Sequence, residues 1–424
     1  MTRPREPLSH VDAAWLRMDD PTNTMVITNL ITFDEPIEFG AIEALFRDRV
    51  LRERRFRQRV VAARLETPHW EDVADVDLKW HLHRVALPDP GGDAELHDLV
   101  SELGSTPLSR DQPLWQAHVV ERYRGGGALV VRLHHCIGDG VALVSMLLGL
   151  TDEGHAMVTP EVGLLPERPE RLVDQVRLFG SQAATLGRLL LLSSDPPGPL
   201  KGPLGPRKRL VCSRPVPLAL VKAIVAAVGG TVNDVLVGAL AGAFRRYLAQ
   251  RGAPLPAREP RAMVPMYIRG RTEGGELGNH FGLVFLQLPL DTEDPQARVR
   301  VTRERMDAIK KSPEAQVSLG VLAGLGVAAD EIEQIAIDLF TRKATVMITN
   351  VAGPPSPLHL IGKSVSSMVV WAPVSGHLGV GISFLSYAGA VRVAVKSDAG
   401  LVPDPERLLE AFDAELDALR QIAA

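Results

Sequence analysis

The chain has few cysteines, few aromatic residues and no long apolar run. Only 2 of its 424 residues are cysteine, and only 5% are aromatic. Two cysteines exclude a disulfide-stapled fold and fit a reducing compartment. The absence of an apolar stretch of about 18 residues argues against a transmembrane helix, and the N-terminus lacks the apolar core of a secretory signal. We therefore expect a cytoplasmic protein, peripheral at most to the inner membrane or to lipid bodies.

The charge balance gives no general attraction to nucleic acid. Lysine and arginine number 47 against 51 aspartate and glutamate, for a formal net charge of -4. A nucleic-acid-binding domain is usually basic, so we expect no nucleic-acid partner. A chain of 424 residues also exceeds what one hydrophobic core usually organises, which predicts two domains.

Helix-like and strand-like segments alternate along the chain, which predicts an α/β (α+β) fold. In the first half, residues 39–51 and 93–103 have helical apolar spacing. Residues 117–123 and 128–133 read as two strands joined by a glycine-rich turn at 124–127, which is a hairpin signal. In the second half we expect helices at 218–228 and 405–422, and strands at 261–267, 282–289, 344–349, 365–372, 378–386 and 390–396.

The composition changes between the two halves. Residues 172–193 have one apolar helical face, which could pack on the protein or lie on a lipid surface. The following stretch, up to residue 210, is dense in proline and glycine and reads as a linker. We therefore divide the chain into an N-terminal domain at 1–170, a helix and linker at 171–210, and a C-terminal domain at 211–424. The basic residues of the linker favour a solvated loop; the alternative is contact with phosphates: Lys201, Arg207, Lys208 and Arg209.

The segment HHCIGDG, residues 134–140, carries the chemistry. Side chains alternate across a strand, so His134 and His135 are expected to face opposite ways, one toward a site and one into the structure. Asp139 is placed to fix the loop geometry. The helix expected after Gly140 would present free backbone N–H groups that could stabilise an oxyanion. A neutral histidine suits proton abstraction near pH 7.

Other chemical readings are weaker. Cys136 is turned away from the face of His135 by strand alternation, so we do not expect a nucleophile there. His81 and His83 share a face, yet no further ligands converge on them, and we expect no metal site. No cofactor motif is present: Gly324 and Gly326 mimic part of a dinucleotide fingerprint without the preceding strand.

The pattern HHxxxDG resembles the signature of the CoA-dependent acyltransferase superfamily. Further segments resemble the bacterial wax ester synthase/diacylglycerol acyltransferase family, in collinear order over nearly the whole chain. They are PLW at 113–115, ND at 233–234, RAMVPMYIR at 261–269, LGNHFG at 277–282, TNVAGP at 349–354 and SYAG at 386–389. Ala352 replaces the usual proline of the fifth segment, and Cys136 a small apolar residue of the signature.

The resemblance implies two chloramphenicol-acetyltransferase-like domains, each a mixed sheet packed with helices, with a tunnel at their interface. It implies His135 as general base, supported by His134, with Asp139 orienting the loop and the Gly140 N–H as candidate oxyanion donor. Acyl-CoA would be a co-substrate, with no resident cofactor.

The other family segments supply candidate substrate-binding residues. Asn279 is a candidate polar contact. Asn233 and Asp234 are further candidates for substrate binding. The equally favoured alternative is that they only cap a helix. Trp115 is a candidate for which packing is the preferred interpretation.

Three functions remain open on this evidence. The first is esterification of a long-chain fatty alcohol or diacylglycerol by acyl-CoA, forming wax esters or triacylglycerol. The second keeps the fold and the chemistry but takes another acceptor: a polyketide, a glycolipid or an amine. The third is a non-catalytic lipid-surface protein, against which the intact His135, Asp139 and Gly140 argue. Attachment to a membrane or lipid droplet is compatible with each of them.

Overall fold

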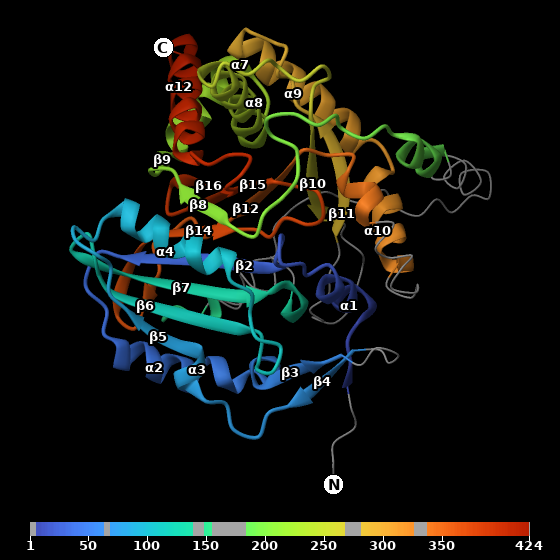
Figure 1. Ribbon diagram of the computed structural model, residues 1–424. Coiled ribbons are helices and arrows are strands. Elements are labelled where there is room, and N and C mark those ends of the chain that lie inside the picture. Colours follow the sequence, from blue (N-terminus) through green and yellow to red (C-terminus); the bar gives the residue numbers. More distant parts are fainter. Residues whose placement is uncertain are drawn as a thin grey trace, which may run out of the picture.

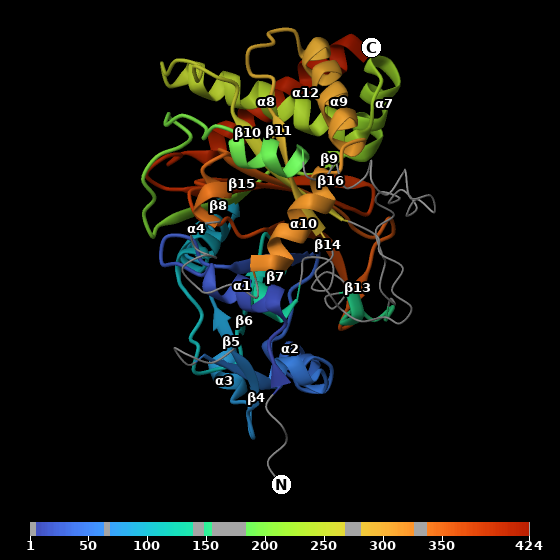
Figure 2. The ribbon, with the colours of Figure 1, turned by 90° about the vertical axis from the view of Figure 1, so that its right-hand side faces the viewer.

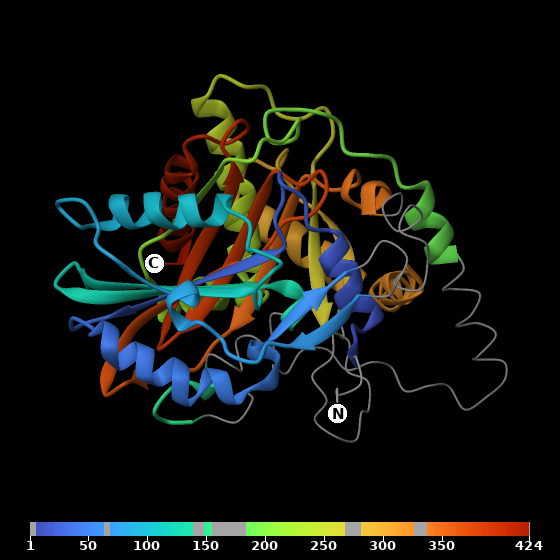
Figure 3. The same ribbon diagram turned by 60° about the horizontal axis from the view of Figure 1, so that its bottom comes forward.

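The computed structural model describes residues 6–62, 68–138, 148–154, 184–267, 281–325 and 337–423. Within them the chain forms two mixed β-sheets with helices on their outer faces (Figure 1). The strands of the two sheets cross at a steep angle, the N-terminal strands in blue and teal, the C-terminal strands in orange and red (Figure 3). The predicted α/β architecture is confirmed.

The N-terminal sheet has six strands in the order β13-β14-β2-β7-β6-β5. Its strands are β2 (Val26–Phe33), β5 (Leu82–Val85), β6 (Trp115–Tyr123), β7 (Gly126–His134), β13 (His359–Leu360) and β14 (Lys363–Trp371). The accompanying helices are α1 (His10–Arg17), α2 (Phe39–Asp48), α3 (Leu78–His81) and α4 (Asp93–Ser105), with short 3-10 turns at Val50–Arg52, Arg54–Arg57 and His135–Ile137 (η3). A small sheet of β1 (Glu6–Pro7), β4 (His69–Asp72) and β3 (Gln58–Val61) lies beside it.

β6 and β7 form the hairpin that the sequence predicts. The turn is tighter than expected, because Arg124 and Gly125 alone make it, both in the left-handed region at φ 52 and 84. Two such residues give a turn whose twist matches that of the strands. All nine residues of β7 are buried, since α2 covers one face of the sheet and α4 with the C-terminal half covers the other. The HHCIGDG segment therefore begins at the end of a strand that is packed on both faces.

The C-terminal sheet has the order β11-β10-β12-β15-β16-β8, with β9 also pairing with β16. Its strands are β8 (Lys208–Cys212), β9 (Val216–Pro217), β10 (Arg261–Tyr267), β11 (Phe281–Gln287), β12 (Val346–Ala352), β15 (Val380–Tyr387) and β16 (Ala390–Asp398). Its helices are α7 (Leu218–Val228), α8 (Val232–Gln250), α9 (Pro295–Lys310), α10 (Glu314–Leu325) and α12 (Pro405–Ala423). α7, α8, α9 and α12 cover the outer face, at the top of Figure 1. α10 instead lies beside α1 of the N-terminal half (Figure 2).

The C-terminal half of the chain contributes a strand to the N-terminal sheet. β14 comes from the C-terminal half of the chain, yet it pairs with β2 inside the N-terminal sheet. Its last residue, Trp371, donates from Nε1 to the carbonyl oxygen of Val211 on β8 at 2.9 Å. Apolar side chains from both sheets and from α4 share one buried cluster, which includes Leu30, Val130 and Ala394. The halves are therefore interlocked as well as packed, a feature that the division at residue 210 did not anticipate.

The proline-rich linker is not a solvated loop. Lys201 is buried and its Nζ donates to the carbonyl oxygens of Arg342, Thr341 and Ala344. Lys208 pairs with Asp398 at 2.7 Å, and both side chains are buried. Arg209 pairs with Asp98 and Glu406. The expectation of a solvated basic cluster was wrong for Lys201 and Lys208, because buried carbonyl oxygens and a buried carboxylate lie opposite them. Arg207 is exposed, as expected, and the carboxylate partners of Arg209 are at the surface.

Two elements bear on membranes. Of the predicted helix 172–193, residues 184–191 are helical, and 172–183 lie outside the described residues. Across the part of the chain that the structure describes, no single helix is long and apolar enough to cross a bilayer; α7 and α8 meet the length and composition criteria only as a pair bent by 91°.

Candidate active site

The motif is anchored where β7 ends. His134 is the last residue of β7 and His135 the first of η3. The His134 N–H donates to the carbonyl oxygen of Leu114 at 3.0 Å, and the His135 N–H donates to that of Met25 at 2.8 Å. Both backbone positions are thus fixed by neighbouring segments, which holds the two imidazoles on a rigid element.

The His135 imidazole lies buried against an aromatic ring. The residue is 7% exposed, and its ring stacks on Trp15 with the centroids 4.1 Å apart. Among the described residues, its Nδ1 has no hydrogen-bond partner. Burial, helped by the neighbouring charge of His134, lowers the pKa of His135 from 6.5 to about 4. The ring is therefore neutral at pH 7 and can accept a proton.

His134 is held by the structure around it. Its Nδ1 accepts the Cys136 N–H at 3.2 Å, and its Nε2 lies 3.7 Å from Asp19 Oδ1. Burial alone would raise the pKa of Asp19, but His134, the Met25 N–H and Arg110 together lower it. Asp19 is thus an anion next to the supporting histidine. Asp19 could not be predicted from the sequence, because it is more than 100 residues from the motif and belongs to none of the segments that resemble the family.

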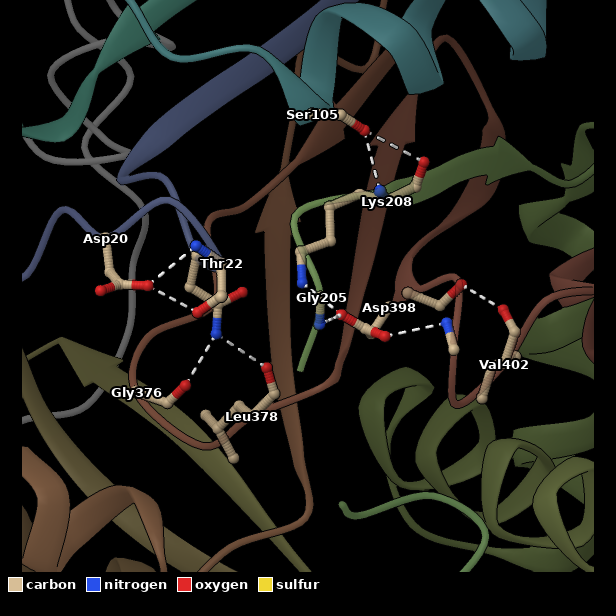
Figure 4. Close-up of polar contacts among 12 residues, drawn as sticks. Asp20, Thr22, Ser105, Gly205, Lys208, Gly376, Leu378, Asp398 and Val402 are labelled. Atoms are coloured by element: carbon tan, nitrogen blue, oxygen red, sulfur yellow. Dashed lines mark hydrogen bonds and ion pairs between the residues drawn. The ribbon is translucent and has the colours of Figure 1, made fainter. Parts of the chain in front are cut away.

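The loop after Asp19 is tied to the C-terminal half. Asn23 donates from Nδ2 to the carbonyl oxygens of Gly376 at 2.8 Å and Leu378 at 3.1 Å. Asp20 steadies the turn by accepting hydrogen bonds from the N–H and Oγ1 of Thr22 (Figure 4). The segment that supports the motif is therefore fixed to both halves.

Two buried cations lie between the sheets near the motif. Arg132, two residues before His134 on β7, donates to Gln116 Oε1 at 2.9 Å and to the Thr106 carbonyl oxygen. Lys396 on β16 is 2% exposed, and it lies two residues from Ala394, which packs against the N-terminal sheet. Burial lowers the pKa of Lys396 to about 7, and the charges of Lys208 and Arg132 act in the same direction.

Three of the predicted site residues lie outside the described residues: Asp139, Gly140 and Asn279. Their roles remain predictions. Trp115 is in the core, 1% exposed, with its Nε1 donating to the Phe56 carbonyl oxygen at 3.0 Å and its ring stacked on His81. The geometry is that of a packing residue, and contact with substrate remains a prediction.

The structure brings two of the family segments together. Asp234 is buried and forms a capping box with Thr231 at the start of α8. Asn233, one residue earlier, accepts a hydrogen bond from Asn350 Nδ2 of β12 at 3.1 Å. Asp234 therefore shapes the helix end, whereas Asn233 and Asn350 form an exposed polar pair. A role of this pair in substrate binding remains a prediction.

A narrow cavity adjoins the TNVAGP segment. Gly353 and Pro354 line it together with Asn29 of β2 and apolar side chains of β14 and β15. A side chain at Gly353 would meet the Ser386 carbonyl oxygen at 2.4 Å, so the close approach requires glycine.

The residues considered as a nucleophile or as metal ligands make structural contacts instead. Cys136 is fully buried and burial raises its thiol pKa well above the usual range, which leaves it protonated. His81 Nδ1 is 2.7 Å from the Trp115 carbonyl oxygen, and His83 stacks on His118. The described residues contain no group of three or more histidine, cysteine, aspartate or glutamate side chains suited to a metal ion.

The two mixed sheets, with a neutral histidine held at the end of a buried strand, fit the two-domain, chloramphenicol-acetyltransferase-like class of acyltransferases. Sequence profiles agree: the wax ester synthase/diacylglycerol acyltransferase catalytic domain matches residues 8–190, and the WS/DGAT C-terminal domain matches residues 277–420. The chain belongs to the wax ester synthase/diacylglycerol acyltransferase family.

Individual relatives support the assignment. A protein of Mycobacterium tuberculosis named as a putative diacylglycerol O-acyltransferase is 31% identical over 396 residues, which covers 84% of this chain and 83% of the relative. The wax ester synthase/diacylglycerol acyltransferase of Marinobacter aquaeolei has a solved structure that superposes with a TM-score of 0.75 at 25% identity, covering 99% of each chain. The first condensation domain of the calcium-dependent antibiotic synthetase shares the fold, with a TM-score of 0.64 at 16% identity over 100% of this chain and 97% of that one.

Proposed function

We propose that this acyltransferase moves an acyl group from acyl-CoA to the hydroxyl of a long-chain fatty alcohol or a diacylglycerol, with His135 as the general base. The observation that carries the proposal is the neutral, buried imidazole of His135 with an unpartnered Nδ1. Membership of the family supports the choice of substrates. The other acceptors and a purely structural lipid-binding role have no comparable support.

In the proposed reaction, His135 takes up one proton and later releases it. His135 accepts the proton of the alcohol as its oxygen attacks the thioester carbonyl carbon. The tetrahedral intermediate collapses with cleavage of the carbon–sulfur bond, and the imidazolium returns the proton to the CoA thiolate. Because both substrates react directly, no acyl-enzyme forms. The developing oxyanion needs a donor, for which the Gly140 N–H remains the predicted group.

The histidine's surroundings suit this task. A pKa of about 4 keeps His135 unprotonated in the resting enzyme, and stacking on Trp15 fixes the ring plane. The Asp19 carboxylate lies 3.7 Å from His134 Nε2, so it favours transient positive charge on the histidine pair. In this proposal Asp19 and His134 position and stabilise, and His135 transfers the proton.

The test is release of CoA thiol from palmitoyl-CoA by purified protein, with hexadecanol, dioleoylglycerol or no acceptor. Acceptor-dependent release should fall by at least about 100-fold in His135→Ala, as for loss of a general base. Cys136→Ala is the matched control, since it alters the next side chain and should keep the activity. A folded protein without acceptor-dependent release, or a His135→Ala variant with full activity, would refute the proposal.

We also propose that residues 184–191 help attach the protein to a lipid surface from the cytoplasmic side. Leu190 and Leu191 are 49% and 87% exposed on this helix, so its outer side offers apolar surface that a lipid layer would cover. Vesicles of phosphatidylglycerol and phosphatidylcholine should sediment the protein but not the Leu190→Ser, Leu191→Ser double variant. Ile422→Ser, at another exposed apolar residue, is the control; equal sedimentation of all three proteins would contradict attachment through this helix.

A further inference from the structure

Asn29 is a polar residue in an otherwise apolar wall. It lies on β2 between Ile27 and Ile31, which face the apolar cluster under α2, and it pairs with Val131 on β7 and Val370 on β14. Its side chain is 4% exposed, and its Nδ2 has no hydrogen-bond partner within the part of the chain that the structure describes. An unpaired buried amide typically costs about 1–3 kcal/mol of stability, so its retention calls for a ligand or a bound water.

The amide lies on the wall of the cavity beside Gly353. Apart from Asn29, its side-chain lining is mainly apolar, including Ile31, Met368, Val370 and Leu385. A second cavity, lined by Leu129, Leu150 and Leu360 among others, shares Ile31 and Met368 with the first. The two cavities therefore lie on either side of the same two side chains.

Met368 can join the two cavities. The first is narrow, with room for about one water molecule, so a lipid chain enters only if a wall moves. Methionine is unbranched and adapts its shape easily, and Met368 lies in both walls. Rotation of this side chain would open one apolar channel along β2 and β14, with the Asn29 amide exposed on its wall.

The distance between Asn29 and His135 along the sheet determines which part of a lipid lies beside the Asn29 amide. Asn29 pairs with Val131, four residues before His135 on β7. Four strand residues span roughly 13 Å at about 3.3 Å each. A chain that reacts at His135 and follows this sheet face therefore places a position well beyond its reacting carbon beside the amide.

We propose that Asn29 forms a subsite for an oxygen atom carried by the lipid chain of one substrate, a hydroxyl, keto or ester oxygen remote from the reacting group. The amide donates from Nδ2 to that oxygen within an apolar channel, where a hydrogen bond discriminates strongly against a chain that lacks it. The identification of the ligand as a substrate rests on the acyl transfer proposed above. The oxygen can belong to the acyl donor or to the acceptor, and the two sources are separated by experiment.

Two substrate pairs test the subsite by kcat/KM. Stearoyl-CoA is compared with 12-hydroxystearoyl-CoA using hexadecanol, and hexadecanol is compared with dioleoylglycerol using palmitoyl-CoA. In Asn29→Leu, which keeps the volume and removes the amide, the oxygenated member of one pair should lose about tenfold relative to the plain member. The pair that responds identifies the source of the oxygen. Thr28→Val, the neighbouring buried residue on the opposite face of β2, should change neither ratio.

A binding measurement separates failure of the subsite from failure of the proposed reaction. Without CoA, 12-hydroxystearic acid should raise the Tm of the wild-type protein more than stearic acid does, and Asn29→Leu should remove that difference. If neither pair's ratio changes in Asn29→Leu and the Tm shifts stay equal, the amide holds only a water molecule and the subsite is refuted. Equal loss with all substrates would assign Asn29 a purely structural role and refute it as well.

Discussion

Lys396 should make the protein more stable when it is replaced by an apolar residue of similar size. Burial lowers its pKa from 10.5 to about 7, and no hydrogen bond or ion pair to its Nζ is found among the described residues. One pKa unit corresponds to about 1.4 kcal/mol, so the shift costs the folded state up to about 5 kcal/mol at pH values below 7. Replacement of an unpaired buried charge by a packed apolar side chain is commonly stabilising.

The sign of the pH dependence follows from proton binding. Between pH 7 and 10.5 the unfolded chain holds a proton on Lys396 that the folded chain has released. Stability from this group therefore rises with pH, by up to about 1.4 kcal/mol per pH unit. Lys396→Met lacks this contribution, so its advantage over the wild type should be large at pH 7 and should vanish toward pH 10.

Urea unfolding at pH 7, 8, 9 and 10 measures this difference through the transition midpoints. Lys222→Met, at an exposed lysine of α7, is the control and should follow the wild type at each pH. A constant offset between Lys396→Met and the wild type across the series would refute the reasoning. A less stable Lys396→Met at pH 7 would show that Lys396 is charged and compensated in the folded protein.

Three further predictions concern catalysis and the packing between elements. In the pH profile of kcat/KM, the fall in activity on the acid side should lie well below pH 6.5. The free enzyme loses activity only when His135, with its pKa of about 4, takes up a proton. A fall centred near pH 6.5 would contradict His135 as the base. Gly242→Ala should destabilise the protein by about 3 kcal/mol or more in urea unfolding, because the new methyl would lie 2.1 Å from Arg298 Nη1 and break the buried pair of Arg298 with Glu415. Gly40→Ala is the control: its new methyl would meet open space, so it should be neutral or stabilising. Equal effects of the two variants would contradict the clash. Asn23→Ala removes two hydrogen bonds to the C-terminal half and should cost about 1–3 kcal/mol, measured by the same assay; an unchanged midpoint would show that water replaces both bonds.

Local pattern was sufficient for most elements of the fold. The β6–β7 hairpin follows from two aliphatic runs around a glycine turn, and α12 follows from its apolar spacing after Pro405. Local pattern also predicted a strand at 365–372, but it could not say which sheet the strand joins. Pairing of β14 with β2 depends on contacts more than 300 residues apart, for which a single sequence carries no period or spacing.

The site was predictable where a motif is contiguous and not where it is assembled by packing. His134 and His135 stand together in the sequence, so both could be singled out, although strand alternation was the wrong reason for their different surroundings: β7 ends at His134, and His135 begins a 3-10 turn. Asp19 reaches His134 through the packing of distant segments, with the Met25 N–H and Arg110 donating to its carboxylate. Linker residues such as Lys201 and Lys208 were misread for the same reason, because their composition is that of a solvated loop while their partners lie 140 to 190 residues away.

The interlocked halves limit how substrates reach His135. Opening the two sheets like a hinge would break the Trp371 bond to Val211, the Asn23 bonds to the loop at Gly376 and the apolar cluster shared by both sheets. A hinge also needs a connection that can bend, whereas β14 is paired along its length inside the opposite sheet. Access must therefore depend on side chains and loops that move while the sheets stay packed. Met368, with a flexible chain between two apolar cavities, is a side chain of this kind, and a long lipid substrate suits such a route because it can enter end first.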